Sequence, residues 1–589
     1  MLGLAWQADH LALPVLLATQ CLQGLVPLAT AWLTKTLFDL LAQKLHGPAT
    51  PSLVQDLFFL LAAQGVITLL SQVIAPINQY FNARLVRTLT LLLRKNVYQK
   101  IDSLQGLAYF EDPSFHDIIQ VAANNAQIGP LQALSIFTTL LQGGITLLSF
   151  LSVLLALSPL LTAIVCLAVV PQLFMQLRLS RQRFVTVLSN TPKERRASYY
   201  GQVLSWVTHA KEVRLFNLGE YFLRKFVATT REIHLAQDRQ QRRELHWQTA
   251  LSLLASLIST GTFVFVVVQA FSGRLSLGEV ALYIGAVLST TESLSTIAGA
   301  LSRMNDSLLF FTQYTQLLAL KETLFLSPAP RPVPPLTSGI TLHNISFRYN
   351  DQQPWVLRNV NLFIPASRCL ALVGLNGAGK TTLVKLLMRL YDPTEGRILW
   401  DGIDIREFDP REFRRHMGAI FQDFSRYDLS VQENIGMGNV ARIEDEALVR
   451  EAAQKAGLAR RIEALPQGYQ SMLSNWLAEQ HAGVDLSGGE WQKVALARMF
   501  MQDADILILD EPTAALDAQA EYELYCHFRE LMQGHTCVLI THRFSTVRMA
   551  DNIAVLENGH IVEYGIHDDL LSYNGPYAKL YSMQAESYH

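Results

Sequence analysis

The sequence predicts a chain of two unlike parts, an all-α membrane domain of six spanning helices followed by an α/β domain. Half of the 589 residues are hydrophobic, and the mean hydropathy of +0.20 is high for a protein that folds in water. The first half contains long runs without a charged side chain, whereas charged residues are frequent in the second. We expect the parts to be residues 1–320, a linker at 321–339, and residues 340–589.

Six runs are long enough to cross a bilayer, which takes about 20 apolar residues in a helix. No charged residue lies between Asp117 and Arg178, a stretch that fits two spans joined at Ser158-Pro159. The sixth run carries one charge, Glu292. Buried helices of a large soluble core are the alternative, but so many long uncharged runs rarely occur together in soluble proteins. The predicted spans are residues 11–34, 57–83, 130–157, 160–177, 247–271 and 280–302.

Basic residues gather in two long segments, one after the second predicted span and one after the fourth. Basic loops stay in the cytoplasm, so we expect these segments and both termini there. We interpret each segment as helical extensions of the spans that end in a short transverse helix, with solvated loops as the alternative. The residues are Arg84, Arg87, Arg94, Lys95 and Lys100 in the first segment, and Arg178, Arg181, Arg183, Lys193, Arg195 and Arg196 in the second.

The net charge, the cysteines and the prolines bear on three questions: whether nucleic acid is a partner, whether cysteines bind a metal, and what structure the linker has. A formal net charge of -2 gives no reason to expect a nucleic-acid partner. The five cysteines show no metal-ligand spacing. Five prolines between Pro328 and Pro335 prevent a helix from continuing, so an extended linker is predicted there.

A glycine-rich segment follows an apolar strand. Residues 374–381 read GLNGAGKT, which matches GxxxxGK[ST], and they lie between a strand at 369–373 and a helix from Thr382. In such a loop, backbone N–H groups wrap phosphates, Lys380 reaches the β/γ oxygens and the Thr381 hydroxyl binds Mg²⁺. The flanking strand and helix argue against a chance match, so ATP and Mg²⁺ are predicted ligands.

A second apolar strand, residues 506–509, ends in Asp510 and Glu511. The first carboxylate suits the Mg²⁺ shell, and the second is placed to polarise an attacking water. A solvated acidic pair is the alternative, which the upstream glycine-rich loop disfavours.

The segment LSGGE, residues 486–490, precedes a helical pattern. Serine and glycines at a helix N-terminus form an anion site. One loop already holds the triphosphate, so this second site makes sense if it closes over the nucleotide of a partner subunit. A simple helix cap is the alternative.

The order of these motifs resembles the nucleotide-binding domain of ABC transporters. The resemblance covers about residues 340–581, and the six-span half resembles the exporter-type transmembrane domain, which forms a domain-swapped dimer. The matching positions are Tyr349, the loop 374–381, Gln422, LSGGE, Asp510-Glu511, Ala515-Leu516-Asp517 and His542. Ala515 departs mildly from the usual serine.

The resemblance implies a role for each matching residue. Tyr349 would stack on adenine, and Gln422 would touch Mg²⁺ and relay the nucleotide state to the membrane half. Glu511 would be the catalytic carboxylate, Asp517 would sit at the dimer seam, and His542 would contact the γ-phosphate. Ser487 and Gly489 would contact the γ-phosphate held by the other subunit. The implied catalytic residues are Glu511, His542 and Gln422; the Mg²⁺ ligands are Thr381, Gln422 and Asp510; the further ATP-binding residues are Gly374, Asn376, Gly377, Ala378, Gly379, Lys380, Thr382 and Gly488.

These expectations describe an ATP-driven exporter that works by alternating access. Two ATP molecules would join two cassettes, and hydrolysis would let them part. One chain holds one cassette, so a dimer is required, and the intact catalytic set favours a homodimer over a heterodimer. The expected location is a bacterial inner membrane, with the nucleotide-binding domain in the cytoplasm. An importer built on the exporter fold, for example for siderophores, and an ATP-gated channel or regulator are the alternatives.

The cargo is the least defined part of the prediction. Residues 486–498 are similar to those in exporters of ribosomally made peptides such as lanthipeptides, so a peptide or an amphipathic, drug-like or lipid-like molecule is expected. Glu292 lies midway along the sixth predicted span. Such a carboxylate either meets a cationic group of the cargo in a cavity, or hydrogen-bonds to Thr290, Thr291 or a neighbouring helix.

Overall fold

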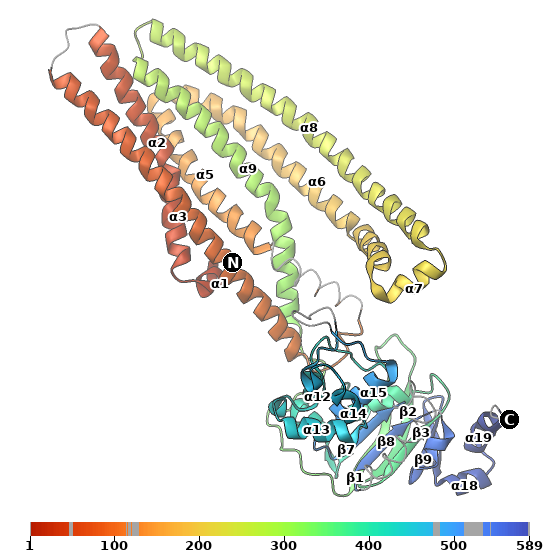
Figure 1. The fold of residues 1–589 in the computed structure, drawn as a ribbon. Helices are drawn as coiled ribbons and strands as arrows, with labels where there is room; N and C mark the ends of the chain where they lie inside the picture. Colours follow the sequence, from red (N-terminus) through yellow and green to blue (C-terminus); the bar gives the residue numbers. More distant parts are fainter. Residues whose placement is uncertain are drawn as a thin grey trace. The chain divides into compact units, whose positions relative to one another are not determined.

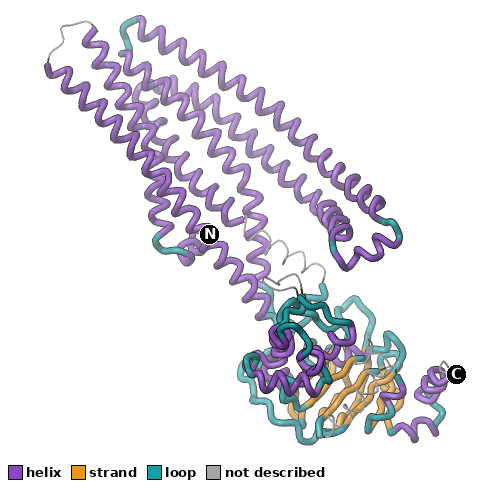
Figure 2. The backbone as a smooth tube through the Cα atoms, viewed as in Figure 1, coloured by secondary structure: helices purple, strands orange, loops and turns teal. Residues whose placement is uncertain are grey.

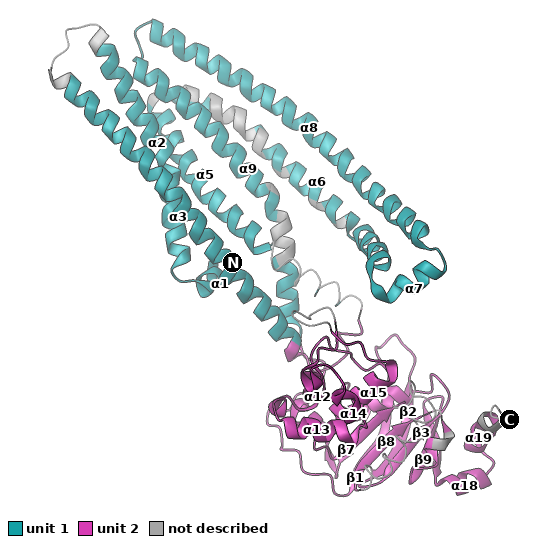
Figure 3. Cartoon of the chain, in the orientation of Figure 1, with its two compact units in different colours: residues 1–101, 114–320 teal, residues 102–113, 321–589 magenta. Residues whose placement is uncertain are grey.

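The chain folds into two compact units in a computed structural model (Figure 1). It describes residues 2–45, 51–112, 115, 119, 129–474, 483–511, 534–541 and 543–586. Unit 1 comprises residues 1–101 and 114–320, and unit 2 comprises residues 102–113 and 321–589 (Figure 3). Unit 1 is drawn as helices, and the strands belong to unit 2 (Figure 2). A short segment from the first half of the sequence therefore folds with the second half.

Among its described residues, unit 1 contains six long helices and two short ones. The longest have 53 residues, which corresponds to about 80 Å and far exceeds a hydrocarbon core of about 30 Å. These helices therefore continue beyond the membrane. The elements are α1 (Leu2–Ala8), α2 (Ala12–Leu45), α3 (Pro51–Ser103), α5 (Gly129–Leu157), α6 (Pro159–Ser205), α7 (Val207–Leu215), α8 (Gly219–Phe271) and α9 (Leu277–Ala319).

Five of these helices, α2, α3, α5, α8 and α9, contain described stretches long and apolar enough to cross a membrane. Each of these stretches overlaps one of the predicted spans, although several are much longer. The remaining predicted span, residues 160–177, falls within α6, where many side chains lie outside the described residues.

The helices of unit 1 pack in two groups. Helices α2, α5 and α9 contact one another, while α6 runs along α8 and also contacts α9. Helix α7 joins α6 to α8 and lies across their ends (Figure 1). One apolar cluster links α5, α8 and α9; it contains Phe150, Leu154, Val266, Tyr283, Ala286 and Val287.

Hydrogen bonds and an ion pair attach the turn between α1 and α2, and α2 itself, to α3. Asp9 Oδ1 accepts hydrogen bonds from the backbone N–H groups of Leu11 and Ala12, each at 3.0 Å, and so caps α2. Arg84 of α3 donates to Asp9 Oδ2 at 2.6 Å. Between the same two helices, Asn78 donates to Gln23 at 3.1 Å. The turn from α1 into α2 is thereby fixed to α3.

Unit 2 contains two sheets. The first is antiparallel in the order β2-β1-β4-β5, and the second has the order β10-β9-β3-β8-β7-β6 and is parallel except for the β9–β10 pair. The strands are β1 (Gly339–Phe347), β2 (Leu357–Pro365), β3 (Cys369–Val373), β4 (Glu395–Trp400), β5 (Ile403–Asp404), β6 (Met417–Ile420), β7 (Ile506–Asp510), β8 (Thr536–Ile540), β9 (Asn552–Glu557) and β10 (His560–Gly565).

The central parallel strands are buried along their whole length. All residues of β3, β7 and β8 are buried, which explains why their sequences are continuous apolar runs rather than alternating ones. Helices α11, α15, α18 and α19 contact this sheet. The helices of unit 2 are α10 (Lys380–Leu387), α11 (Pro410–Arg415), α12 (Val431–Gly436), α13 (Glu446–Lys455), α14 (Ala459–Glu463), α15 (Gly488–Phe500), α17 (Phe544–Val547), α18 (His567–Ser572) and α19 (Pro576–Glu586).

The proline-rich stretch before β1 contains no helix and is bound along unit 2. The N–H of Phe325 donates to Asp392 at 2.7 Å. The carboxylate of Asp401 accepts hydrogen bonds from the N–H groups of residues 337–339 at 2.7 to 2.8 Å. This stretch is therefore held to the surface of the domain that follows it.

We predict that Gly278 permits the close approach of α9 to α2. A Cβ atom there would collide with the carbonyl oxygen of Lys35 and the carboxylate of Asp39. Overpacking of this kind costs about 1–3 kcal/mol, so Gly278→Ala should lower the melting temperature of the purified protein in nanodiscs. Gly285→Ala is the matched control, because a Cβ there meets only Ala31 at 3.9 Å. Equal melting temperatures for the two variants would contradict the packing argument.

Candidate functional site

The glycine-rich loop lies between the end of β3 and the start of α10. Gly377 and Gly379 have positive φ angles of 81° and 105°, which favour glycine. A Cβ at Gly374 would collide with the carbonyl oxygen of Leu556. Asn376 and Gly377 are exposed at the tip, while Ala378 is buried. The loop has the open backbone surface that phosphate oxygens need.

Lys380 points back into this loop. Its Nζ atom donates to the carbonyl oxygens of Gly374 at 2.8 Å and Leu375 at 3.1 Å. Burial lowers the pKa of the ammonium, and the carboxylates of Glu511 and Asp510 act in the opposite direction. The charge of Lys380 is thus held at the loop, where it can meet a phosphate.

The carboxyl end of β7 brings two carboxylates to the same edge of the sheet. Burial, together with the nearby Glu511 carboxylate, raises the pKa of Asp510 to about 6. The following residue, Glu511, has a φ of 49°. This left-handed backbone conformation costs about 1–3 kcal/mol for a residue other than glycine. Gln422 Nε2 donates to Glu511 Oε2 at 2.8 Å. The structure therefore brings together three of the predicted site residues.

The oxygen atoms here suit a hard cation. Asp510 is buried and accepts a hydrogen bond from the Thr381 hydroxyl, so two of the predicted Mg²⁺ ligands are adjacent. Among the described residues, no cluster of three His, Cys, Asp or Glu side chains could hold a metal by itself.

Tyr349 stands beside the loop within an aromatic cluster. Its hydroxyl is 2.9 Å from Thr382 Oγ1, and its ring meets Phe347 and Tyr391 edge-on, with centroids 5.1 and 5.4 Å apart. Lys385 Nζ lies 5.6 Å from the ring centroid. These contacts fix the ring at the edge of the loop.

The LSGGE segment begins α15. Ser487 caps this helix, accepting a hydrogen bond from the N–H of Glu490 at 3.3 Å, and Glu490 accepts one from the N–H of Ser487 at 2.8 Å. Ser487 and Gly488 are exposed, and Gly489 is half-buried. Among the described residues, no hydrogen bond or ion pair joins residues 487–490 to residues 374–382.

Residues 102–112, which begin with the last two residues of α3, are anchored to α10 and to the residues just after it. Glu111 accepts hydrogen bonds from Lys385 at 2.5 Å and from the Tyr391 hydroxyl at 2.6 Å. Burial opposes the ionisation of Glu111, but these hydrogen bonds outweigh it and hold the pKa of the carboxyl below its usual value. The N–H of Leu107 donates to the carbonyl of Leu390 at 3.0 Å.

The remaining predicted site residues lie elsewhere. Asp517 and His542 are outside the described residues. Glu292 is exposed on α9, in unit 1. Neither nearby threonine binds its carboxylate: Thr291 Oγ1 donates to the carbonyl of Val287 at 2.9 Å, and the buried Thr290 hydroxyl has no partner among the described residues.

Sequence reasoning missed the residues that connect Tyr349 to the segment 102–113. Lys385 and Tyr391 belong to no motif, and each lies more than 270 positions from Glu111 along the chain. Glu111 stands in a mixed polar and apolar patch, YFEDP, which is the only signal that the sequence offers.

A family model described as ABC transporter matches residues 357–514. Two relatives extend over most of the chain. The subtilin transport ATP-binding protein SpaT of Bacillus subtilis is 29% identical over 518 residues, which are 87% of this chain and 83% of that protein. The nisin transport ATP-binding protein NisT of Lactococcus lactis subsp. lactis is 27% identical over 584 residues, which are 98% of this chain and 95% of that protein.

A third relative is similar over a shorter stretch. An ATP-dependent lipid A-core flippase of Syntrophus aciditrophicus (strain SB) is 43% identical over 252 residues, which are 43% of this chain and 40% of the flippase. This similarity covers less than half of either protein.

The solved structure of a bacterial Atm1-family ABC exporter with ATP bound has the same fold. It matches with a TM-score of 0.85 and 24% identity, and the match covers 98% of both chains. This confirms the predicted fold class, a helical membrane domain followed by an α/β nucleotide-binding domain. Together, the comparisons identify residues 357–514 as an ABC transporter domain, within a chain that has the fold of an ABC exporter.

Proposed function

We propose that this chain forms a homodimer in a bacterial inner membrane and exports a peptide, using ATP and Mg²⁺ in the cytoplasm. One observation supports the homodimer: the chain offers a glycine-rich loop at 374–382 and an exposed helix N-terminus at 487–489, and among the described residues no hydrogen bond or ion pair joins them. A second copy would supply the missing half of each site. Each of the two sites would then have Lys380, Glu511 and Gln422.

The chemistry follows from the side chains around the loop. Backbone N–H groups of residues 374–381 and Lys380 would bind the phosphates, while Tyr349 would stack on the base. Glu511 would orient and deprotonate the attacking water, and this water would have to replace the hydrogen bond from Gln422 Nε2 to Glu511 Oε2. Bound Mg²⁺ would neutralise charge on the phosphates, held by Thr381, Asp510 and Gln422.

Residues 102–113 offer a route from nucleotide to membrane. They fold with unit 2, and they continue directly from α3, which ends at Ser103. A rotation of the nucleotide-binding unit would therefore carry the end of α3 with it. Because Lys385 contacts both Glu111 and the Tyr349 ring, the anchor lies one side chain away from the expected adenine position.

The peptide cargo rests on the relatives. The two that span most of this chain are named for the transport of subtilin and nisin, whereas the flippase is similar over 43% of this chain. Cargo contacts the membrane domain, so similarity along the whole chain is the more informative guide. The resemblance of residues 486–498 to lanthipeptide exporters points the same way. The exposed carboxylate of Glu292 on α9 could bind a cationic peptide group.

The test of this proposal is reconstitution of the purified chain alone in proteoliposomes. We expect ATP hydrolysis without any partner chain, stimulated by a cationic lanthipeptide that accumulates on the side away from the nucleotide-binding units. Glu511→Gln should reduce hydrolysis at least about hundredfold, the scale for loss of a general base. Absence of hydrolysis by the wild type would refute the homodimer. Stimulation by a labelled phospholipid or a hydrophobic dye, but not by the peptide, would refute the peptide cargo.

A second prediction concerns Tyr349. Base–aromatic stacking is worth about 1–3 kcal/mol, so Tyr349→Ala should raise the KM for ATP by roughly tenfold, with little change in kcat. Tyr349→Phe keeps the ring and loses only the hydroxyl contact to Thr382, so its KM should stay near that of the wild type. If both variants raise KM equally, the hydroxyl and not stacking is responsible.

A third prediction concerns the anchor of residues 102–113. Glu111→Gln should leave basal ATP hydrolysis largely intact and reduce the amount of cargo moved per ATP, because the docked segment loses its ion pair with Lys385. Asp102→Asn is the control, since Asp102 pairs with Arg411 through a side chain that is 78% exposed and should contribute little. Equal coupling in Glu111→Gln and the wild type would exclude the anchor from transmission.

The same anchor predicts a pH dependence. The pKa of Glu111 is lowered in the folded protein from an ordinary value of 4.5, so its ionised form is favoured by folding. The stabilisation is then complete above about pH 4.5 and is lost as the pH falls through the lowered value. The difference in melting temperature between wild type and Glu111→Gln should be constant at neutral pH and shrink below pH 4.5. A difference that grows on acidification would contradict the assignment.

A further inference from the structure

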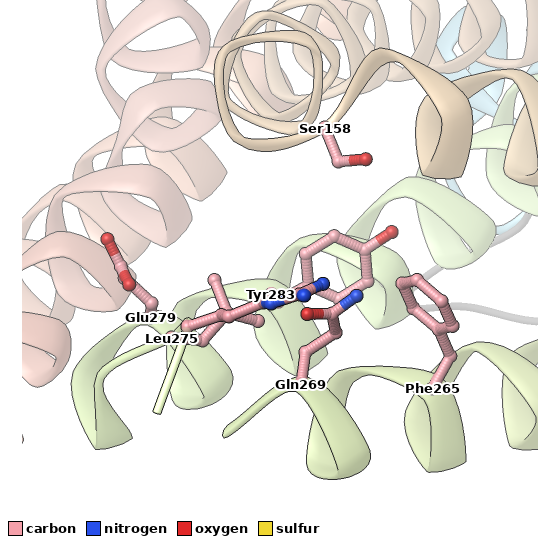
Figure 4. A pocket seen from close by; sticks show the side chains of 7 residues that line it. Ser158, Phe265, Gln269, Leu275, Glu279 and Tyr283 are labelled. Atoms are coloured by element: carbon pink, nitrogen blue, oxygen red, sulfur yellow. The ribbon is translucent and has the colours of Figure 1, made fainter. Parts of the chain in front are cut away.

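A cavity of about 220 Å³ lies in unit 1, where the ends of α8 and α9 meet the turn between α5 and α6 (Figure 4). Its lining includes Phe265, Gln269, Arg274, Leu275, Glu279 and Tyr283. Helix α8 ends at Phe271 and α9 begins at Leu277, so the cavity opens where these membrane-spanning stretches end. It is at the end of α9 opposite to the one from which the chain continues into unit 2.

Arg274 brings to this cavity a charge that no side chain among the described residues neutralises. Its guanidinium has no ion-pair or hydrogen-bond partner among the described residues, and the stretch 118–177, which includes side chains outside that set, contains no acidic residue. The nearest acids are already engaged. Glu279 accepts a hydrogen bond from the N–H of Ser276 at 2.9 Å and lies 3.8 Å from Lys35 Nζ, and Asp39 accepts one from the N–H of Gly278 at 2.9 Å.

Tyr283 brings a second polar group that lacks a partner. The residue is 3% exposed, and its hydroxyl makes no hydrogen bond with the described residues. Buried hydroxyl groups are nearly always hydrogen-bonded, so this one calls for a ligand or water. In Figure 4 the Tyr283 ring stands next to Gln269 and Phe265 on one side of the cavity, with Ser158 across from it.

We propose that this cavity binds the phosphate head group of a phospholipid. Arg274, Tyr283 and the Gln269 amide are hydrogen-bond donors, and guanidinium matches phosphate in a two-pronged geometry. Phe265 and Leu275 give apolar walls for the start of the acyl chains. Pockets that enclose a drug-sized ligand measure about 300–1,000 Å³, so this cavity fits a head group rather than a whole cargo molecule.

The position in the membrane favours a lipid over other sources of phosphate or carboxylate. Head groups lie at the level where spanning helices end, and arginine at that level attracts them. The negative charge of Glu279 does not oppose this binding strongly, because Lys35 lies beside it. The inference depends on membrane insertion and not on the proposed cargo.

The test is native mass spectrometry of the delipidated full-length dimer in detergent, titrated with dioleoylphosphatidylglycerol. We expect one lipid per subunit to bind more tightly than the rest. Dioleoylglycerol has the same acyl chains without the phosphate and should not occupy this site. Arg274→Gln should weaken the tight binding by about tenfold, as expected for a charge-assisted hydrogen-bonded pair, and Tyr283→Phe should weaken it by roughly threefold.

The matched control is Arg181→Gln, which removes an exposed arginine of α6 outside the cavity. It should leave the tight site unchanged, and basal ATP hydrolysis should be unaffected in all three variants, which checks their folding. Tyr283→Phe decides the question if Arg274→Gln does not fold. The proposal is overturned if dioleoylglycerol binds equally well, or if Arg181→Gln weakens binding as much as Arg274→Gln. It is also overturned if inorganic phosphate or a peptide with a free carboxyl terminus displaces the lipid. Since neither cargo nor transport enters this measurement, its failure would not affect the proposed export function.

Discussion

Parallel pairing of β3, β8 and β7 is the constraint on which the nucleotide site depends. In this register Cys369 is opposite Cys537, and Cys537 is opposite Leu507, so the carboxyl ends of β3 and β7 reach the same edge of the sheet. The phosphate loop follows the first strand, and Asp510 ends the second. Ligands of open α/β sheets bind at this edge. Without that register, Lys380 and Glu511 would be on unrelated surfaces.

Burial at that edge of the sheet shifts the pKa values of the charged residues there. Asp510 is buried between Lys380 and Glu511, and its raised pKa and the lowered pKa of Lys380 both reflect the cost of burying charge. The hydrogen bond between Gln422 and Glu511 holds the expected general base in place before nucleotide arrives. The site therefore buries charged groups at an energetic cost: a cation would offset the carboxylate of Asp510, and phosphate oxygens would offset the ammonium of Lys380.

The segment that begins at the end of α3, which includes Glu111, packs next to this site. Glu111, Lys385 and Tyr391 form a compact cluster on the flank of α10, next to the ring of Tyr349. A residue that belongs by sequence to the membrane half is thus packed into the nucleotide-binding half. The cavity near Arg274 lies at the start of α9, at the opposite end of that helix from Ala319, where the chain leaves unit 1.

The sequence by itself determined the local features. Long uncharged runs marked the spanning helices, because a lipid environment requires apolar side chains over a fixed length. The spacing of glycines in GLNGAGKT marked the phosphate loop, because only those positions must adopt glycine conformations or avoid a clash. These signals need no knowledge of distant residues. The fold class, a domain of apolar helices followed by an α/β domain, could therefore be predicted from local patterns.

Only the tertiary structure decided which residues far apart in the sequence contact one another. The contacts of Glu111 with Lys385 and Tyr391 span 274 and 280 positions, and that of Gln422 with Glu511 spans 89. No local pattern encodes such pairs, because each depends on how sheets and helices pack. The same holds for the cavity of Arg274 and Tyr283, where an arginine in a turn and a tyrosine in a helix become a site only because α8, α9 and the α5–α6 turn enclose the space between them.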